Sequence, residues 1–242
     1  MQFSNAEPVI GFSTGALALS DWRMGIEISR KLHVRAIELS ALRLGEFEPL
    51  VRACRRLDLS GFDYVSVHLP SHFSAAEESG VLRNVEELAS LRWPLILHPD
   101  TVSHWASWRS FGNLICLENM DKRKPVGRTV EELADVFERL PDARFCFDYG
   151  HARQVDPTMS QAVRLLEAFG DRLEQIHFSD VDASNRHQPL NHPALAAFSR
   201  VRDLAPRSVP VILETLVDFE GAELQLRLTR KFFSSARQAV AS

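Results

Sequence analysis

Short apolar runs and longer amphipathic stretches alternate along this chain. The apolar runs are rich in Val, Ile, Leu and Phe, and several lack polar alternation, which is typical of parallel strands covered on both faces. The stretches between them carry apolar residues at helical spacing. The pattern predicts eight strand–helix units, with strands at 8–13, 34–39, 62–69, 94–98, 113–119, 144–148, 173–178 and 209–215.

The clearest predicted helix is TVEELADVFERL at 129–140. Thr129 and Glu132 have the spacing of a capping box, and an apolar stripe follows them. Pro141 ends this helix because proline cannot continue the hydrogen-bond ladder. The stretch 101–110 is the weakest helix, and the remaining predicted helices are 21–32, 45–57, 83–91, 160–169, 193–203 and 221–239.

Eight successive strand–helix units predict a parallel sheet with right-handed crossovers. A length of 242 residues suits a single (β/α)₈ TIM barrel covering residues 1–242. The main alternative is an open doubly wound sheet. The first strand–helix turn, GFSTGALA, lacks the G-x-G-x-x-G of dinucleotide-binding sheets, so we expect the closed barrel.

Composition narrows the class of protein further. Hydrophobic residues make up 45% of the chain and the formal charge is −4, so a large core is expected and a grip on duplex DNA is disfavoured, though not excluded. The N-terminus resembles no signal peptide, and no apolar run reaches the ~20 residues that span a bilayer. The three cysteines have neither disulfide nor metal spacing. We therefore expect a cytoplasmic protein with no membrane partner.

Six of the predicted strands end in a histidine or an acid, within VSVHLP, PLILHPD, LICLENM, RFCFDYGH, LEQIHFSD and VILETL. In a barrel these ends converge on one mouth, where TIM-barrel active sites lie. Imidazole and carboxylate together suit Zn²⁺, Mn²⁺, Fe²⁺ or Co²⁺. The strand-end residues are His68, His98, Glu118, Asp148, His177 and Glu214, with His151 just beyond Asp148.

The position of each residue suggests a role within this set. We expect one divalent ion among Glu118, Asp148, His177 and Glu214, and His68 and His98 could hold a second ion bridged by Glu118. His151 could bind another metal or hold substrate, and Gly150 before it would permit a sharp turn. Arg186 could pair with an anionic group of the substrate. Asp180 could orient a metal-bound imidazole from behind.

The ordered set H, H, E, D-x-G-H, H-x-S-D and E resembles the xylose isomerase-like TIM barrels. This superfamily joins sugar isomerases and epimerases to endonuclease IV, and the resemblance covers nearly the whole chain. In the isomerase branch it implies metal ligation by Glu118, Asp148, His177 and Glu214. It also implies that the two glutamates move protons on either face of the substrate. Dimers and tetramers are common in this branch, so a homo-oligomer is consistent with the resemblance.

The endonuclease IV branch resembles the chain at further positions. It implies additional metal ligation by His68, His98 and His151. His187 matches the histidine of a later D-x-H motif that completes a third zinc site, but Asn185 replaces the acid of that motif. An amide is a poorer metal ligand than a carboxylate, so a third site would need Asp180 or Asp182 to substitute for the missing acid.

Three functions follow as hypotheses. The first is a metal-dependent isomerase or epimerase of a small sugar, polyol or hydroxy-carbonyl compound, with Zn²⁺ or Mn²⁺ as the expected metal and one to three ions bound. In it Glu118 and Glu214 transfer protons while His151 and Arg186 orient the substrate. The second is an endonuclease IV-like zinc phosphodiesterase. The third is a barrel that binds metal or ligand without catalysis.

Overall fold

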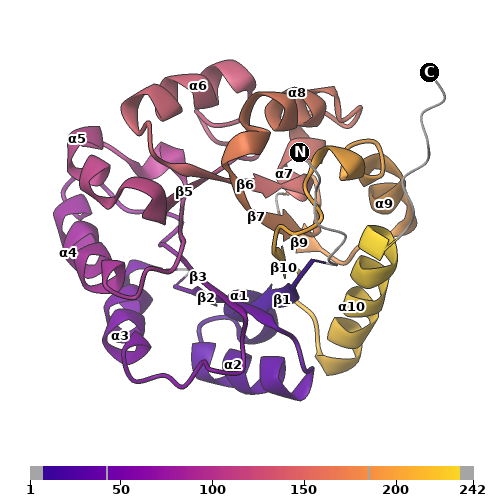
Figure 1. Ribbon diagram of the computed structural model, residues 1–242, viewed down its shortest axis with the longest axis horizontal. Coiled ribbons are helices and arrows are strands. Elements are labelled where there is room, and N and C mark those ends of the chain that lie inside the picture. Colours follow the sequence, from indigo (N-terminus) through magenta and orange to yellow (C-terminus); the bar gives the residue numbers. More distant parts are fainter. Residues whose placement is uncertain (1–7, 42, 185, 235–242) are drawn as a thin grey trace.

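The computed structural model describes residues 8–41, 43–184 and 186–234. Eight parallel strands close into a barrel in the order β1-β10-β7-β6-β5-β4-β3-β2 (Figure 1). The predicted barrel is confirmed, and the open sheet is excluded because β1 pairs with both β2 and β10. The barrel strands are β1 (Ile10–Ser13), β2 (Ala36–Ser40), β3 (Tyr64–His68), β4 (Leu95–Leu97), β5 (Ile115–Glu118), β6 (Arg144–Asp148), β7 (Leu173–Phe178) and β10 (Val211–Leu213).

Each strand lies within one residue of its predicted range, and most are shorter. The ladder hydrogen bonds of β4 and β10 stop early, so His98 and Glu214 lie one residue beyond their strands. His68, Glu118 and Asp148 are the last residues of β3, β5 and β6. All of these positions therefore lie at the carboxyl end of the barrel.

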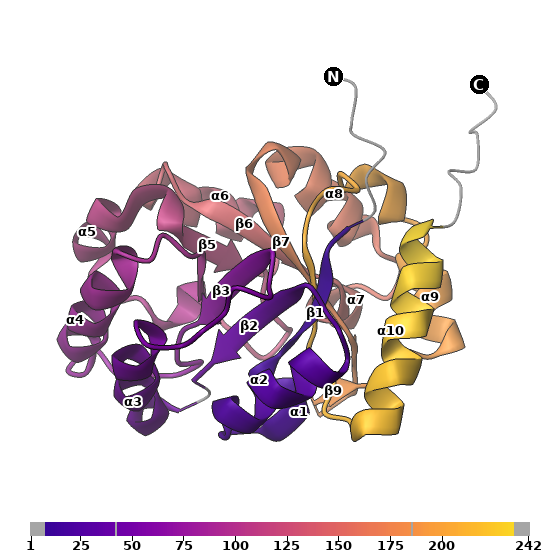
Figure 2. The same cartoon turned by 60° about the horizontal axis from the view of Figure 1, so that its bottom comes forward.

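A ring of helices surrounds the barrel (Figures 1 and 2). Thr129 caps α6 by accepting a hydrogen bond from the amide of Glu132 at 3.3 Å, as predicted, whereas the Glu132 carboxylate accepts from the amide of Arg128 at 2.8 Å instead of returning to Thr129. The helices are α1 (Thr14–Ala18), α2 (Trp22–Lys31), α3 (Leu44–Cys54), α4 (Glu78–Ala89), α5 (Trp105–Trp108), α6 (Val130–Arg139), α7 (Tyr149–Val155), α8 (Ser160–Phe169), α9 (His192–Phe198) and α10 (Phe219–Ser234).

The structure departs from the predicted helices in several places. The weak helix at 101–110 is reduced to α5 followed by a 3₁₀ helix at Arg109–Leu114, and the helix at 193–203 breaks after α9. Positions 235–239 of the last predicted helix lie outside the described residues. Helix α7 was not predicted, nor was an antiparallel hairpin of β8 (Asp180–Val181) and β9 (His187–Gln188). Figure 2 shows β9 at the end of the barrel toward which β1 and β2 point.

The two faces of the barrel wall have different chemistry. Alternate strand residues such as Leu39, Val67 and Phe147 belong to a large apolar core shared with the helices. The residues between them face the barrel interior, because successive side chains of a strand point to opposite faces. Among the described interior positions, a separate small apolar cluster is formed by Ile96, Cys116 and Cys146. Buried polar residues fill much of the remaining interior, including Glu38, Ser66, Gln175 and His177.

Within the described part of the chain, no helix combines the length and the apolar character needed to cross a membrane.

The contact between β1 and β2 leaves no room for a side chain at Gly11. A Cβ atom there would lie 1.7 Å from the carbonyl oxygen of Ala36, its partner across the two strands. We expect Gly11→Ala to lower the free energy of unfolding by about 1–3 kcal/mol, the usual range for overpacking a core. Urea denaturation followed by circular dichroism measures this difference.

Gly45 in α3 provides the matched control, because a Cβ atom there would meet nothing within 4 Å. Gly45→Ala should leave stability unchanged or raise it by up to about 1 kcal/mol, since alanine is the better helix former. Equal stability of the Gly11→Ala variant and the wild-type protein would contradict the close pairing of β1 and β2.

Candidate metal centre

His177 occupies the centre of the carboxyl end of the barrel, and carboxylates surround it. Its Nδ1 atom lies 3.2 Å from Glu214 Oε2, 3.3 Å from Glu118 Oε1 and 4.0 Å from Asp148 Oδ2. One ligand atom from each of these four residues lies within 4.8 Å of the others. The structure thus brings together the four residues that were predicted to hold one divalent ion, in a group that we call the four-ligand site.

The inner atoms of this site test whether a cation fits. Three of them are buried without a hydrogen-bond partner among the described residues: Asp148 Oδ2, His177 Nδ1 and Glu214 Oε2. Glu118 Oε2, which also has none there, faces His68 and His98 instead. Buried polar atoms are normally satisfied, and an unpaired buried carboxylate oxygen is especially costly. Three carboxylates and one imidazole are a common donor set for divalent transition metals. A divalent cation therefore fits these residues.

A second group adjoins the first and shares one carboxylate with it. His68 Nε2 lies 3.4 Å and His98 Nε2 lies 3.1 Å from Glu118 Oε2. His68 Nδ1 lies 2.7 Å from the carbonyl oxygen of Leu69. That carbonyl accepts the Nδ1 hydrogen, so Nε2 is the nitrogen that faces the site. These three residues could hold a second cation, bridged to the first through Glu118.

His151 and His187 lie at the edge of the four-ligand site. His151 Nδ1 is 3.1 Å from Glu118 Oε1 and 3.0 Å from the carbonyl oxygen of Asn119. His187 Nδ1 is 2.7 Å from the hydroxyl of Ser179 and 3.9 Å from Glu214 Oε2. Neither histidine belongs to the two compact groups. Asn185, the residue expected to weaken a third metal site, lies outside the described residues.

The sequence D-Y-G-H joins strand β6 directly to helix α7. Asp148 caps this helix, because its Oδ1 atom accepts a hydrogen bond of 2.6 Å from the amide of His151. Its other oxygen remains free for the site. Gly150 does not form the sharp turn that we expected. A Cβ atom at this position would lie 2.6 Å from Val181 Cγ2 and 2.8 Å from the Ser179 carbonyl oxygen, so glycine permits close approach of α7 to β8.

The site opens into a cavity of about 760 Å³ with charged side chains at its rim. Arg186 lies there, 76% exposed, with its Nε atom 3.4 Å from Asp182 Oδ2. Lys124 pairs with Asp100 at 2.8 Å, and Arg123 lies 3.5 Å from Asp121. Each of these rim cations thus faces an acid, so the rim carries little net positive charge. Its aliphatic residues include Ala16, Leu19, Pro189 and Leu216.

Burial and the surrounding charges shift the ionisation of the site residues. Burial lowers the pKa of His68, but the hydrogen bond to Glu118 and the charge of Glu38 outweigh it and raise the pKa to about 9. The pKa of His151 rises to about 10, because the charge of Asp148 and the contact with Glu118 outweigh burial. Burial dominates at His187 and lowers its pKa to about 4.

The two glutamates shift in opposite directions. Burial would raise the pKa of Glu118, but the positive charges of His177 and His98 and its contact with His151 hold that pKa well below its usual value. Burial raises the pKa of Glu214 well above its usual value, since the neighbouring charges of Glu118 and Asp148 oppose the effect of His177. Glu118 is therefore the stronger acid of the two glutamates and Glu214 the weaker.

Two residues of the site were missed by sequence reasoning. Glu38 lies in the middle of β2, fully buried, with Oε2 3.1 Å from His177 Nε2. Asn119 hydrogen-bonds both the amide and the carbonyl of Asp148, at 2.8 and 2.9 Å. Asp180 does not support an imidazole as expected, since it pairs with Arg153 and accepts from Asn191 Nδ2 at 2.8 Å. The available signal for Glu38 was an acid within the apolar run AIELS. This acid lies inside the predicted strand, whereas the other site residues were recognised at strand ends.

Comparison with solved structures places this fold among known proteins. 3-Keto-D-glucoside 4-epimerase from E. coli superposes with a TM-score of 0.60 and 14% identity, covering 93% of this chain and 100% of that one. A xylose isomerase-like TIM barrel protein from Mycobacterium smegmatis in complex with magnesium gives 0.59 and 12%, covering 97% and 99%. The endonuclease IV-like enzyme SacUVDE gives 0.56 and 13%, covering 85% and 83%. The chain has the fold of the xylose isomerase-like TIM barrels, as the sequence resemblance implied.

Comparison of the sequence matches a protein whose name differs from those of the structural neighbours. No family model matches the chain. Among curated proteins, it is 29% identical over 201 residues to the acetyl-coenzyme A carboxylase carboxyl transferase subunit beta of Synechocystis. The match covers 77% of this chain, and the chain spans 59% of the length of that protein.

The raised histidine pKa values predict that metal binding releases protons. Near pH 8, His68 with a pKa of about 9 is mostly protonated in the metal-free protein, and a cation bound by Glu118 would oppose the negative charge that keeps the proton on His68. Titration calorimetry with Zn²⁺ or Mn²⁺ in two buffers of different ionisation enthalpy should therefore give different heats at pH 8. The difference should shrink above pH 10. Buffer-independent heats at pH 8 would contradict the protonated His68.

The free energy of unfolding of the metal-free protein should fall as the pH rises. A histidine pKa raised from about 6.5 stabilises the folded state fully below 6.5, and this contribution is lost as the pH rises through the folded value. For His68 that window runs from about 6.5 to about 9, and for His151 it runs from about 6.5 to about 10. Thermal unfolding with chelator present should thus occur at lower temperature as the pH rises through this window, while metal affinity increases.

Proposed function

We propose that this protein is a divalent-metal-dependent isomerase or epimerase of a small sugar, polyol or hydroxy-carbonyl compound. The observation that carries the proposal is the four-ligand site, where Glu118, Asp148, His177 and Glu214 converge. Its atoms Asp148 Oδ2, His177 Nδ1 and Glu214 Oε2 are buried without hydrogen-bond partners among the described residues. The fold shared with a sugar epimerase supports it. Zn²⁺ or Mn²⁺ suits this mixture of imidazole and carboxylate.

The two glutamates are placed differently with respect to the cavity. A divalent cation supplies Lewis acidity that polarises a substrate carbonyl and makes the adjacent C–H bond more acidic. The Glu214 side chain is 11% exposed to the cavity whereas that of Glu118 is 1% exposed. Glu214 is therefore better placed to exchange a proton with the substrate carbon, and Glu118 serves as the second proton carrier. His151 and Arg186 orient the substrate from the cavity wall.

The cavity indicates the size and chemistry of the substrate. Its volume of about 760 Å³ lies within the usual range for small-molecule sites. The floor is polar and can bind hydroxyl and carbonyl oxygens. The acids beside Arg123, Lys124 and Arg186 reduce the attraction of the rim for a polyanion. The name of the carboxyl transferase relative describes a whole protein, and the chain spans 59% of its length, so that activity is not proposed for this chain.

Replacing Glu214 by glutamine should reduce proton transfer by about 10²–10⁴-fold, the usual contribution of a positioned acid or base. The assay is exchange of substrate C–H for deuterium in D₂O, followed by NMR over a panel of pentoses, hexoses and 3-keto sugars with metal-loaded protein. Glu138→Gln, an exposed substitution on α6, is the matched control and should exchange at the wild-type rate. If Glu214→Gln exchanges a responsive substrate as fast as the wild-type protein, the mechanism is wrong.

An endonuclease IV-like phosphodiesterase is the second candidate, and the group of His68, His98 and Glu118 favours it. Two cations bridged by a carboxylate suit the attack of an activated water on phosphorus. The paired rim cations and the net charge of −4 disfavour a long phosphate backbone as substrate.

Metal content and one cleavage assay separate the candidates. We expect one metal per chain from elemental analysis of protein purified without added metal, and no cleavage of DNA with an abasic site at low salt. Two or three zinc ions together with cleavage would establish the phosphodiesterase instead. Bound metal with no turnover of sugars or phosphodiesters would support a non-catalytic barrel.

A further inference from the structure

A fully buried carboxylate lies directly beneath the four-ligand site, on the interior face of β2. Glu38 Oε2 is 3.1 Å from His177 Nε2, 2.7 Å from Gln175 Nε2 and 3.3 Å from the hydroxyl of Ser66. Its other oxygen, Oε1, is buried without a hydrogen-bond partner among the described residues. Glu38 therefore approaches His177 from the side opposite to the carboxylates of the four-ligand site.

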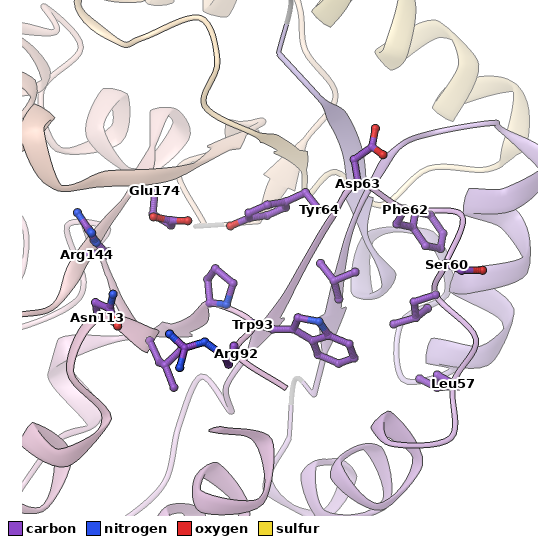
Figure 3. Close-up of a pocket in the computed structure, with 14 residues that line it drawn as sticks. Leu57, Ser60, Phe62, Asp63, Tyr64, Arg92, Trp93, Asn113, Arg144 and Glu174 are labelled. Carbon is purple, nitrogen blue, oxygen red and sulfur yellow. The ribbon is translucent and has the colours of Figure 1, made fainter. Parts of the chain in front are cut away.

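The polar contacts continue from Glu38 toward the amino-terminal end of the barrel. Gln175 Nε2 donates to Glu38 and also lies 2.7 Å from His177 Nε2, and Gln175 Oε1 accepts a hydrogen bond of 2.9 Å from the hydroxyl of Tyr64. Tyr64 lines a hollow of about 610 Å³ at that end of the barrel. Figure 3 shows its ring between Asp63 and Glu174, with the hydroxyl on the side of Glu174. A series of contacts thus runs through the barrel interior from this hollow to His177.

The chemistry of imidazole gives this arrangement a consequence for metal binding. His177 faces the four-ligand site with Nδ1, so Nδ1 must offer its lone pair when a cation binds. The remaining hydrogen of the neutral ring then resides on Nε2. Glu38 Oε2 lies at the distance of an acceptor for that hydrogen. An acceptor on the far nitrogen fixes the tautomer and the orientation of a metal-binding histidine and increases its basicity.

A purely structural role does not explain a carboxylate at this position. Replacing buried charged groups with apolar residues of similar volume is often neutral or stabilising. Glu38 is 0% exposed and keeps one oxygen without a partner. No Lys or Arg appears among the described residues in contact with Glu38, so the imidazole of His177 is the group that can supply it with positive charge or a charge-assisted hydrogen bond.

We propose that Glu38 is a positioning residue for the metal ligand His177, and that Gln175 and Tyr64 hold Glu38 in place. This inference rests on the metal site of the proposed function and extends it to residues that touch neither metal nor substrate. Its consequence is that metal affinity depends on a side chain on β2, a strand that contributes no residue to the two candidate metal groups.

Glu38→Gln tests this role with little change of shape. Titration of metal-free protein with Mn²⁺, followed by calorimetry and by the electron paramagnetic resonance signal of free Mn²⁺, should show affinity weakened by about 10–100-fold. The thermal midpoint of the metal-free variant should fall, because one partner of a buried pair has been removed, so the loss of metal affinity is the result that tests the role. The ¹⁵N shifts of the His177 ring in Zn²⁺-loaded wild-type protein should show Nε2 protonated.

Tyr64→Phe tests the same series of contacts from its far end. It removes one hydrogen bond to Gln175, worth about 1 kcal/mol, so we expect metal affinity to fall by about fivefold. This variant also supplies the comparison if Glu38→Gln folds poorly. Wild-type affinity of Glu38→Gln, or of Tyr64→Phe where Glu38→Gln does not fold, would overturn the inference.

Glu78→Gln is the matched control, because Glu78 is a glutamate with 1% exposure that lies outside the site. Its carboxylate accepts from the amides of Ser103 and His104 and from Trp108 Nε1, at 2.9–3.1 Å. Glu78→Gln should lower stability and leave Mn²⁺ affinity unchanged. If wild-type protein binds no metal, the proposed function fails together with this inference. If wild-type protein binds metal and Glu38→Gln binds it equally well, the inference alone fails.

Discussion

The burial of four carboxylates around one imidazole is the constraint on which the barrel interior depends. Glu38, Glu118, Asp148 and Glu214 all lie within 4.0 Å of a ring nitrogen of His177. Removing so many acids from water is costly unless positive charge accompanies them. The neighbouring charges of Glu214, Glu38 and Glu118 outweigh burial and raise the pKa of His177 well above its usual value, so the imidazole supplies one such charge. His68 and His151, whose pKa values are raised to about 9 and about 10, supply further charge, and a divalent cation would supply more.

The outer shell of the barrel provides the stability that the interior lacks. Strand residues that face the helices are apolar and fully buried, and they form one continuous core with the helices. Polar side chains outside the site also organise the segments around it. Glu78 on α4 fixes the segment after β4 by accepting hydrogen bonds from Ser103, His104 and Trp108. Each strand therefore contributes packing through one face and chemistry through the other.

Much of the fold and of the candidate site could be predicted from the sequence, because parallel barrel strands all bring their carboxyl ends to one mouth. This rule made His68, Glu118 and Asp148 recognisable from position alone, and the structure places them together. Glu38 could not be found in this way, since it lies in the middle of its strand. Its position beneath the site depends on the register of β2 beside β3, in which Glu38 lies opposite Ser66. The hairpin that positions His187 was equally hidden, because its two-residue strands carry no periodic signal.

The carboxylate of Glu118 divides its two oxygens between the candidate metal groups. One oxygen faces His177 and His151, and the other faces His68 and His98. The two histidines of the second group lie on β3 and just beyond β4, and they make no part of the four-ligand site. In evolutionary terms, this separation lets a barrel of this kind gain or lose a second cation through two substitutions, without rebuilding the first site.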